Sequence, residues 1–203
     1  MTIINKKNTQ DIINVISQAG IAIIPTETVY GIVCMPNIDS AIEQIYKIKG
    51  RDADQPLQIL IDEPDQVNQY IDDKKLTDKL SKYWPGSLTA ILPINKMPLN
   101  IFSSKLIYKG GIGLRCPDDQ IARDIINKSG GALAATSANK SNVEPNQDPN
   151  DINKVFNDKL LILDDGKRHN VAGSTVINYI PVTPVIVRRG VLSDVAINDL
   201  MET

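Results

Sequence analysis

The chain has 203 residues, of which 42% are apolar, and this composition allows one large core in a single domain spanning residues 1–203. A net charge of −2 excludes proteins that bind nucleic acid through a broad basic face, because that mode needs many cations along the backbone. The polar first residues and the lack of any apolar run of roughly 18 residues predict a cytoplasmic protein with no membrane partner.

Helix-like and strand-like segments alternate along the chain. Asn8 or Thr9 is a suitable N-cap for a helix that carries Ile12 and Ile16 and ends at Gly20. Further helices are predicted after Asp39, at 76–83, 119–129 and 151–156, and after Ser193. Short, continuously apolar runs predict buried strands at 21–24, 57–61, 88–92, 112–115, 132–135, 160–163, 174–180 and 184–187.

These strands favour an α/β fold, because continuously apolar strands are usually covered on both faces of a sheet. The closely spaced runs 174–180 and 184–187 suit a hairpin, so the sheet is predicted to be mixed and open, with flanking helices. Residues 140–150 are rich in Asn, Pro and Ser. They are predicted to form a surface loop or lid, since strands continue on both sides of them.

Residues 25–31 (PTETVYG) directly follow the first predicted strand. Ligands of open α/β sheets bind beyond the carboxyl ends of strands, so hydroxyl groups placed here would face a ligand. The alternative is an ordinary turn in which Thr26 or Thr28 satisfies nearby backbone groups.

A second candidate is the sequence Lys49-Gly50-Arg51, at the end of the helix predicted after Asp39. Ile42, Ile45 and Tyr46 form an apolar stripe, and Lys49 continues it at position i+7. The pattern therefore predicts a cation that points inward. The alternative is that Lys49 extends to solvent and complements the helix dipole, with Gly50 as the helix stop.

Three further segments place small, hydroxyl or cationic residues at strand ends: 110–115 (GGIGLR), 136–139 (TSAN), and 173–175 (GST) with the arginine pair 188–189. Small residues let backbone amides approach a ligand, and a strand-terminal arginine can bind a carboxylate or phosphate through two hydrogen bonds. Taken singly, the first two segments are explained better by an ordinary turn than by a ligand site. The third could be a strand start with solvated arginines, and it decides nothing alone.

Several absences narrow the chemistry. The sequence has no P-loop, no dinucleotide fingerprint, no G-x-S-x-G elbow and no H-E-x-x-H. Two isolated cysteines, Cys34 and Cys116, and a single histidine, His169, predict no structural zinc, no disulfide and no histidine base. Cations and hydroxyls at strand ends remain, and they suit the alignment of anionic substrates in phosphoryl or nucleotidyl transfer.

In order, the segments PTETVYG, KGR, WPGSLT, GLR, TSAN, GSTV and PVIVRRG resemble the YrdC/TsaC family over roughly residues 21–190. The resemblance implies a YrdC/RibB-like twisted sheet with a concave, positive cleft. It also implies L-threonylcarbamoyladenylate synthase activity, a nucleotidyl transfer in which ATP, L-threonine and bicarbonate give threonylcarbamoyl-AMP and pyrophosphate. Mg²⁺ would arrive with ATP, and the product would pass to the complex that transfers threonylcarbamoyl to tRNA.

The resemblance further implies residue roles. Lys49, Arg51, Ser137 and Asn139 would form the catalytic set. Threonine would be held by Thr28, Arg115, Ala135 through its backbone, and Ser174. ATP would be surrounded by Arg51, Gln55, Gly111, Ser137 and Arg188.

The sequence departs from this family at a few positions. Leu60 stands where some members have a histidine, Asp52 and Arg189 stand where proline is frequent, and Asp164-Asp165-Gly166 replaces DGG. The loss of the histidine puts one threonine contact in question.

Two other functions stay open at the level of the sequence. One is a double-stranded RNA-binding module without catalysis, although 4% aromatic residues and an acidic pI oppose it and leave only weak RNA binding. The other is the carbamoyl-transfer domain of hydrogenase maturation, whose attached zinc modules two lone cysteines cannot supply.

Overall fold

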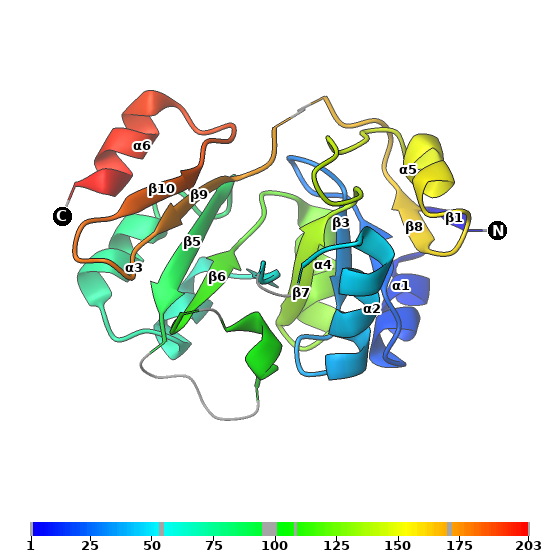
Figure 1. The fold of residues 1–203 in the computed structure, drawn as a ribbon, viewed down its shortest axis with the longest axis horizontal. Coiled ribbons are helices and arrows are strands. Elements are labelled where there is room, and N and C mark those ends of the chain that lie inside the picture. The colour runs from blue at the N-terminus through cyan, green and yellow to red at the C-terminus, as the bar shows by residue number, and fades with distance from the viewer. Residues whose placement is uncertain (1, 53–54, 95–100, 108, 170–171, 203) are drawn as a thin grey trace.

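The computed structural model describes residues 2–52, 55–94, 101–107, 109–169 and 172–202. Within them, ten strands form one sheet in the order β1-β8-β2-β3-β7-β4-β6-β5-β9-β10, and the two termini lie at opposite ends of the long axis (Figure 1). The strands are β1 (Ile3–Asn5), β2 (Ala22–Ile24), β3 (Gly31–Cys34), β4 (Gln58–Ile61), β5 (Leu88–Pro93), β6 (Gly111–Arg115), β7 (Ala132–Ser137), β8 (Leu161–Asp164), β9 (Thr175–Asn178) and β10 (Val185–Arg188).

The predicted helices are present, and most begin at a polar cap. They are α1 (Thr9–Ser17), α2 (Asp39–Lys49), α3 (Lys74–Leu80), α4 (Gln120–Lys128), α5 (Pro149–Val155) and α6 (Asp194–Met201), with 3-10 turns at Pro64–Gln69 and Ser104–Leu106. The side chains of Asp73, Asp119, Asp148 and Ser193 each accept a backbone N–H in the first turn of their helix.

The sheet is mixed, as the sequence predicts. Strand β4 runs parallel to β6 and antiparallel to β7, while β9 runs parallel to β5 and forms the predicted hairpin with β10. Leu60 pairs with Arg115, and Gln58 pairs with Ala135. This register brings residues from distant parts of the sequence to neighbouring places in the sheet.

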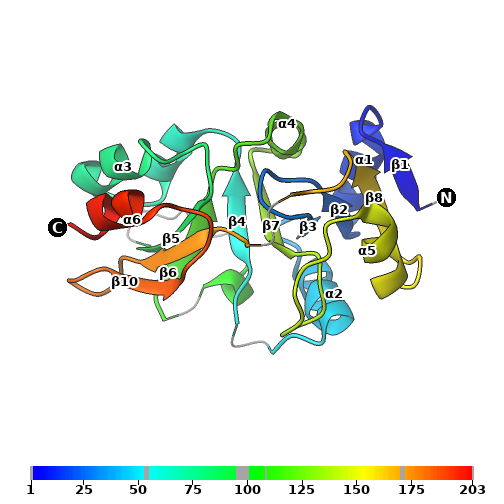
Figure 2. The same cartoon turned by 90° about the horizontal axis from the view of Figure 1, so that it is seen from above.

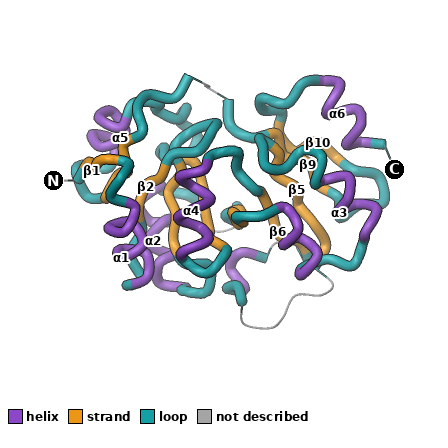
Figure 3. Tube along the Cα trace, turned by 180° about the vertical axis from the view of Figure 1, so that it is seen from behind, coloured by secondary structure: helices purple, strands orange, loops and turns teal. Residues whose placement is uncertain are grey.

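Helices α2 and α4 lie on opposite faces of the sheet, and Figure 2 shows β7 between them. Buried residues of α2 pack with Ile32 and Ile59 on one face. The other face packs Val33, Leu60 and Ala135 against α1 and α4, which lie in front of the sheet in Figure 3. The half of the sheet that contains β2, β3, β7 and β4 is therefore covered on both sides.

Beyond α4, the second face continues over β6, β5 and β9 with half-buried residues. Side chains alternate between faces along a strand, so Gln58, Gly113, Ile91 and Asn178, which follow one another across β4, β6, β5 and β9, share this face. Their partial exposure contrasts with the buried Leu114 and Ile177 of the opposite face. We call the half-buried surface the open face.

Three expectations of local structure need correction. Strands β1 and β3 were not predicted, and β3 begins at Gly31, the last residue of PTETVYG. Helix α1 ends at Ser17, and the left-handed residue after it is Ala19 rather than Gly20. A Cβ on Gly20 would lie 2.6 Å from the Val15 carbonyl oxygen, so close packing, and not a left-handed turn, requires glycine there.

Residues 140–148 contain no helix or strand, and α5 begins directly after them, so the predicted surface loop is confirmed as a loop. None of the described helices has the length and apolar character needed to span a bilayer.

Candidate functional site

The first part of the site is built at the end of α2. Gly50 adopts φ 61°, and its N–H bonds back to the helix, which ends α2 as the sequence predicts. Lys49 therefore sits in the last turn on the buried side of the helix, and it is only 2% exposed. The expectation of an inward-pointing cation is confirmed, and the alternative of a solvated lysine is wrong.

The Lys49 ammonium is surrounded by oxygens of the TSAN segment. Nζ donates to the carbonyl oxygens of Ser137 at 2.5 Å and Asn139 at 2.7 Å, and to Asn139 Oδ1 at 3.1 Å. Ser137 Oγ also donates to Asn139 Oδ1 at 2.5 Å. Since an ammonium has three protons, Lys49 is saturated by these contacts and fixes the turn that presents Ser137.

We call Lys49, Arg51, Ser137 and Asn139 the lysine cluster. Arg51 Nε donates to the Gln55 carbonyl oxygen at 2.8 Å, and Gln55 is itself exposed. Burial, together with the nearby charges of Arg51 and Lys140, lowers the pKa of Lys49 to about 7. The ammonium of Lys49 is thus a buried cation whose three hydrogen-bond acceptors are neutral oxygens.

The second part of the site is the arginine cluster, formed by Glu27, Thr28, Ser87 and Arg115. Arg115 is 3% exposed, and its Nη2 donates to Glu27 Oε1 at 2.7 Å and to Thr28 Oγ1 at 2.9 Å. Ser87 Oγ donates to the same Glu27 oxygen at 3.1 Å. The structure therefore brings the predicted residues Thr28 and Arg115 together and adds a carboxylate between them.

A chain of hydrogen bonds runs along the open face beside this cluster. Thr89 Oγ1 lies 2.7 Å from Gln58 Oε1 and 2.7 Å from Ser174 Oγ. Arg188 Nη2 donates to the Ser174 carbonyl oxygen at 2.9 Å and to its Oγ at 3.2 Å. We call Gln58, Thr89, Ser174 and Arg188 the hydroxyl chain. It joins β4, β5 and β10 to the residue that directly precedes β9.

The cations of the three groups lie close enough to interact. Burial and the charges of Arg115 and Arg51 lower the pKa of Arg188, although part of its side chain is exposed. Mutual repulsion among three arginines and Lys49 indicates a site for an anion, because a negative ligand relieves both the repulsion and the desolvation. The positive character of the predicted cleft is supported, while its concave shape stays a prediction.

Two predicted residues have structural explanations of their own. A Cβ on Gly111 would lie 2.3 Å from Ile180 Cδ1 and 3.1 Å from the Leu92 carbonyl oxygen, so a larger residue there would displace the Ile180 side chain. Ala135 is 1% exposed, and its main chain lies within the sheet between Val33 of β3 and Gln58 of β4. Their contacts with ATP and threonine stay predictions.

Sequence reasoning missed four polar residues of the site: Glu27, Gln58, Ser87 and Thr89. Three of them lie inside motifs that the sequence analysis singled out, PTETVYG and WPGSLT, but neither motif reveals which side chains meet. The register of β4, β6, β5 and β9 places Gln58 and Thr89. Glu27 and Ser87 lie outside these strands and are assigned by their hydrogen bonds in the folded chain.

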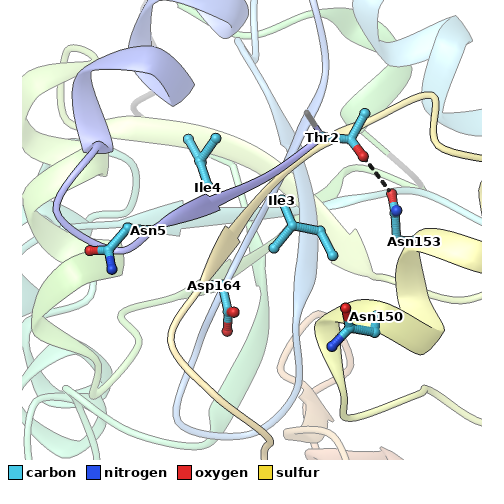
Figure 4. A pocket seen from close by; sticks show the side chains of 7 residues that line it. All are labelled: Thr2, Ile3, Ile4, Asn5, Asn150, Asn153 and Asp164. Carbon is cyan, nitrogen blue, oxygen red and sulfur yellow. Dashed lines mark hydrogen bonds between the residues drawn. The ribbon is translucent and has the colours of Figure 1, made fainter.

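The cavities found in the structure lie elsewhere. One of about 480 Å³ is lined by residues 2–5 and by Asn150, Asn153 and Asp164, and none of the predicted site residues contributes to it (Figure 4). Among the described residues, no group of three or more His, Cys, Asp or Glu side chains is placed to hold a metal ion. Both cysteines are buried and unpaired, and His169 is exposed.

Sequence comparisons match residues 14–190 to the Sua5/YciO/YrdC family model, which is described as "Telomere recombination". A threonylcarbamoyl-AMP synthase from Photorhabdus laumondii is 31% identical over 155 residues, which are 72% of this chain and 79% of the relative.

Solved structures of the same family superpose on this chain. P. abyssi Sua5, solved in complex with L-threonine, superposes with a TM-score of 0.87 at 28% identity and covers 99% of this chain. This chain spans 61% of that Sua5 chain. E. coli YciO superposes with a TM-score of 0.81 at 22% identity, with 94% of this chain and 95% of YciO covered, and supports the fold alone.

Proposed function

The chain belongs to the Sua5/YciO/YrdC family, and on this premise we propose that it is an L-threonylcarbamoyladenylate synthase. It converts ATP, L-threonine and bicarbonate into threonylcarbamoyl-AMP and pyrophosphate. Threonylcarbamoyl-AMP then serves the threonylcarbamoyl modification of adenosine in tRNA. The observation that carries the proposal is the pairing of two clusters with different charge balance: the lysine cluster suits a polyanion, and the arginine cluster suits a zwitterion.

The lysine cluster is suited to the phosphates of ATP. Arg51 offers a planar guanidinium, which spreads charge over phosphate oxygens, and Arg188 approaches from β10. Lys49 holds the Ser137–Asn139 turn, so that the turn meets the α-phosphate in one fixed geometry. Preorganised donors of this kind stabilise the charge that develops between the α- and β-phosphates.

The arginine cluster is suited to an amino acid. The carboxylate of threonine would lie against Arg115, and the amino group would lie on the side of Glu27, since opposite charges face each other in this arrangement. Thr28 supplies a hydroxyl group within this cluster, and Ser174 supplies one in the neighbouring hydroxyl chain. Leu60, in place of a family histidine, is 1% exposed and offers no polar contact there.

The chemistry divides into two steps. The threonine amine attacks bicarbonate and releases water, which gives an N-carboxylate. One oxygen of this carboxylate then attacks the α-phosphorus of ATP and displaces pyrophosphate. Mg²⁺, which arrives with ATP as part of the substrate, neutralises phosphate charge, and the protein supplies alignment and fixed cations.

The product would then pass to the tRNA threonylcarbamoyl transferase complex, and weak RNA contact would accompany that transfer. The net charge of −2 favours local anion binding over broad RNA binding. The relatives named threonylcarbamoyl-AMP synthase, one of them 31% identical over 72% of this chain, favour this activity over hydrogenase carbamoyl transfer.

The proposal is tested by pyrophosphate release from Mg-ATP, with threonine and bicarbonate omitted in turn. Release is expected only when both are present, and serine in place of threonine is a matched substrate control. Equal release without threonine would contradict the proposed function.

A further inference from the structure

The residues that directly follow β8 lie on the upper side of the molecule in Figure 1. They begin the segment that joins the second strand of the sheet to the ninth. Residues 165–169, which we call the crossing segment, form its described first part. They do not belong to the predicted site. They nevertheless make a dense set of contacts with the two segments that carry Thr28 and Arg115.

Tyr30 is the first attachment point. It is 0% exposed, its hydroxyl donates to the Gly166 carbonyl oxygen at 2.8 Å, and it accepts the Asp165 N–H at 3.1 Å. The Arg168 guanidinium lies over its ring, 5.3 Å from the centroid. Tyr30 lies two residues after Thr28 in the sequence, so this contact fixes the segment that presents the threonine-side hydroxyl.

Asp119 is the second attachment point. Its carboxylate caps α4 by accepting the Ala122 N–H at 3.0 Å, and it lies 3.8 Å from Arg168 Nη1. Arg168 Nη2 also pairs with Asp165 at 2.6 Å, and Lys6 pairs with the same aspartate at 2.8 Å. Asp119 follows Arg115 by four residues, as Tyr30 follows Thr28 by two. Arg168 therefore connects the segment that carries Thr28 with the segment that carries Arg115, its hydrogen-bond partner.

From this geometry we propose that Arg168 is a positioning residue of the threonine side: it holds the Thr28 and Arg115 segments in register through Tyr30 and Asp119. The inference rests on the proposed function. The Arg168 side chain is 16% exposed, and the carboxylates of Asp165 and Asp119 that it contacts are 17% and 9% exposed. Without its charge, two partly buried carboxylates would repel each other next to the threonine side.

Arginine is specifically suited to this place. A planar guanidinium can stack on an aromatic ring and direct separate N–H groups to two carboxylates at once. A lysine ammonium retains the charge but cannot satisfy the ring and both carboxylates in the same geometry. Arg168→Lys is therefore expected to recover only part of what Arg168→Met loses.

The test is steady-state pyrophosphate release by Arg168→Met, with KM measured separately for threonine and for ATP. The KM for threonine should rise roughly tenfold, as expected for the combined loss of a stacked cation and a partly buried ion pair, while the KM for ATP stays within about twofold. Arg123→Met is the matched control, because Arg123 is a comparably buried arginine of α4 whose ion pair with Glu63 is 4.0 Å long. It should change neither constant.

A double-mutant cycle separates positioning from general stability. Tyr30→Phe removes the hydroxyl that binds residues 165 and 166, so Arg168→Met and Tyr30→Phe should be strongly non-additive in the KM for threonine. Should Arg168→Met not fold, Arg168→Lys replaces it in the cycle. An unchanged threonine KM in a folded, active variant, or equal rises for both substrates, would overturn this inference alone; a wild type without threonine-dependent release would overturn the proposed function and this inference with it.

Discussion

Lys49 and Arg115 are both buried cations of the site, yet they are compensated in different ways. Lys49, 2% exposed, is held by oxygens of Ser137 and Asn139 that carry no charge. Arg115, 3% exposed, is paired with the carboxylate of Glu27 at 2.7 Å. The two cations are equally buried, but only Arg115 has a negatively charged partner. A polyanion would therefore neutralise more uncompensated charge at the lysine cluster than at the arginine cluster, and the two clusters should prefer different ligands.

The largest effect is expected from Lys49→Met. The substitution removes a donor from each of three oxygens, of which Asn139 Oδ1 keeps another, the Ser137 hydroxyl, and it releases the Ser137–Asn139 turn. Turnover should fall by a factor on the order of 10² to 10³, as when a preorganised transition-state contact is lost. Single-turnover pyrophosphate release measures it, and the exposed residue Lys128 provides the matched control Lys128→Met. Turnover within a few fold of wild type would show that the lysine half does not depend on this contact.

The second effect is expected on the arginine half. Glu27→Gln removes the charge that compensates Arg115, and loss of one partner of a buried ion pair costs about 3 kcal/mol of unfolding free energy. Chemical denaturation measures this loss. Ser87→Ala removes a neutral hydrogen bond to the same oxygen and should cost only about 1 kcal/mol. Equal losses for the two variants would mean that the charge of Glu27 is unimportant.

Lys49 and Glu27 also show which parts of the site can be predicted from the sequence. The helical periodicity predicts that Lys49 points inward, and the glycine at position 50 predicts the end of α2, because both signals are local. The pairing of Glu27 with Arg115 spans 88 residues, and that of Tyr30 with Gly166 spans 136. Such contacts depend on strand order and register, which short-range patterns do not encode.

Strand β3 is a second feature that local sequence patterns did not predict. Its residues Gly31–Cys34 are all buried, but the strand begins at the last residue of PTETVYG, and no turn signal separates loop from strand. Ala19 likewise takes a left-handed conformation next to a glycine that packing requires for another reason. In both places tertiary packing overrides the local preference.

A smaller effect concerns pH and stability. The pKa of Lys49 in the folded protein, about 7, lies below its ordinary value of 10.5. Between these values the unfolded state binds more protons, so the free energy of unfolding of the wild type should rise with pH relative to Lys49→Met, by at most ~1.4 kcal/mol per pH unit. Below pH 7 the difference should be constant. Denaturation curves that stay parallel from pH 6.5 to 9.5 would show that the three oxygen contacts keep Lys49 charged.

The smallest effect is expected for RNA. Duplex RNA should bind weakly at physiological salt and be displaced by ATP, because the cations gather at the site while the whole chain carries a net charge of −2. Fluorescence anisotropy with a labelled duplex measures both. Tight binding that ATP does not displace would favour an RNA-binding module and would place the RNA outside the lysine cluster.

The division of the site into two halves is tested most directly by calorimetric titration of Arg51→Ala and Arg115→Ala with ATP and with threonine. Arg51→Ala should weaken ATP binding and leave threonine binding nearly unchanged. Arg115→Ala should weaken threonine binding by about 1.5 to 3 kcal/mol, the cost of a lost charge-assisted hydrogen bond, and Arg115→Lys should recover little of it. If both alanine variants are still folded at the temperature of the titration and lose the same ligand to the same degree, the division is wrong.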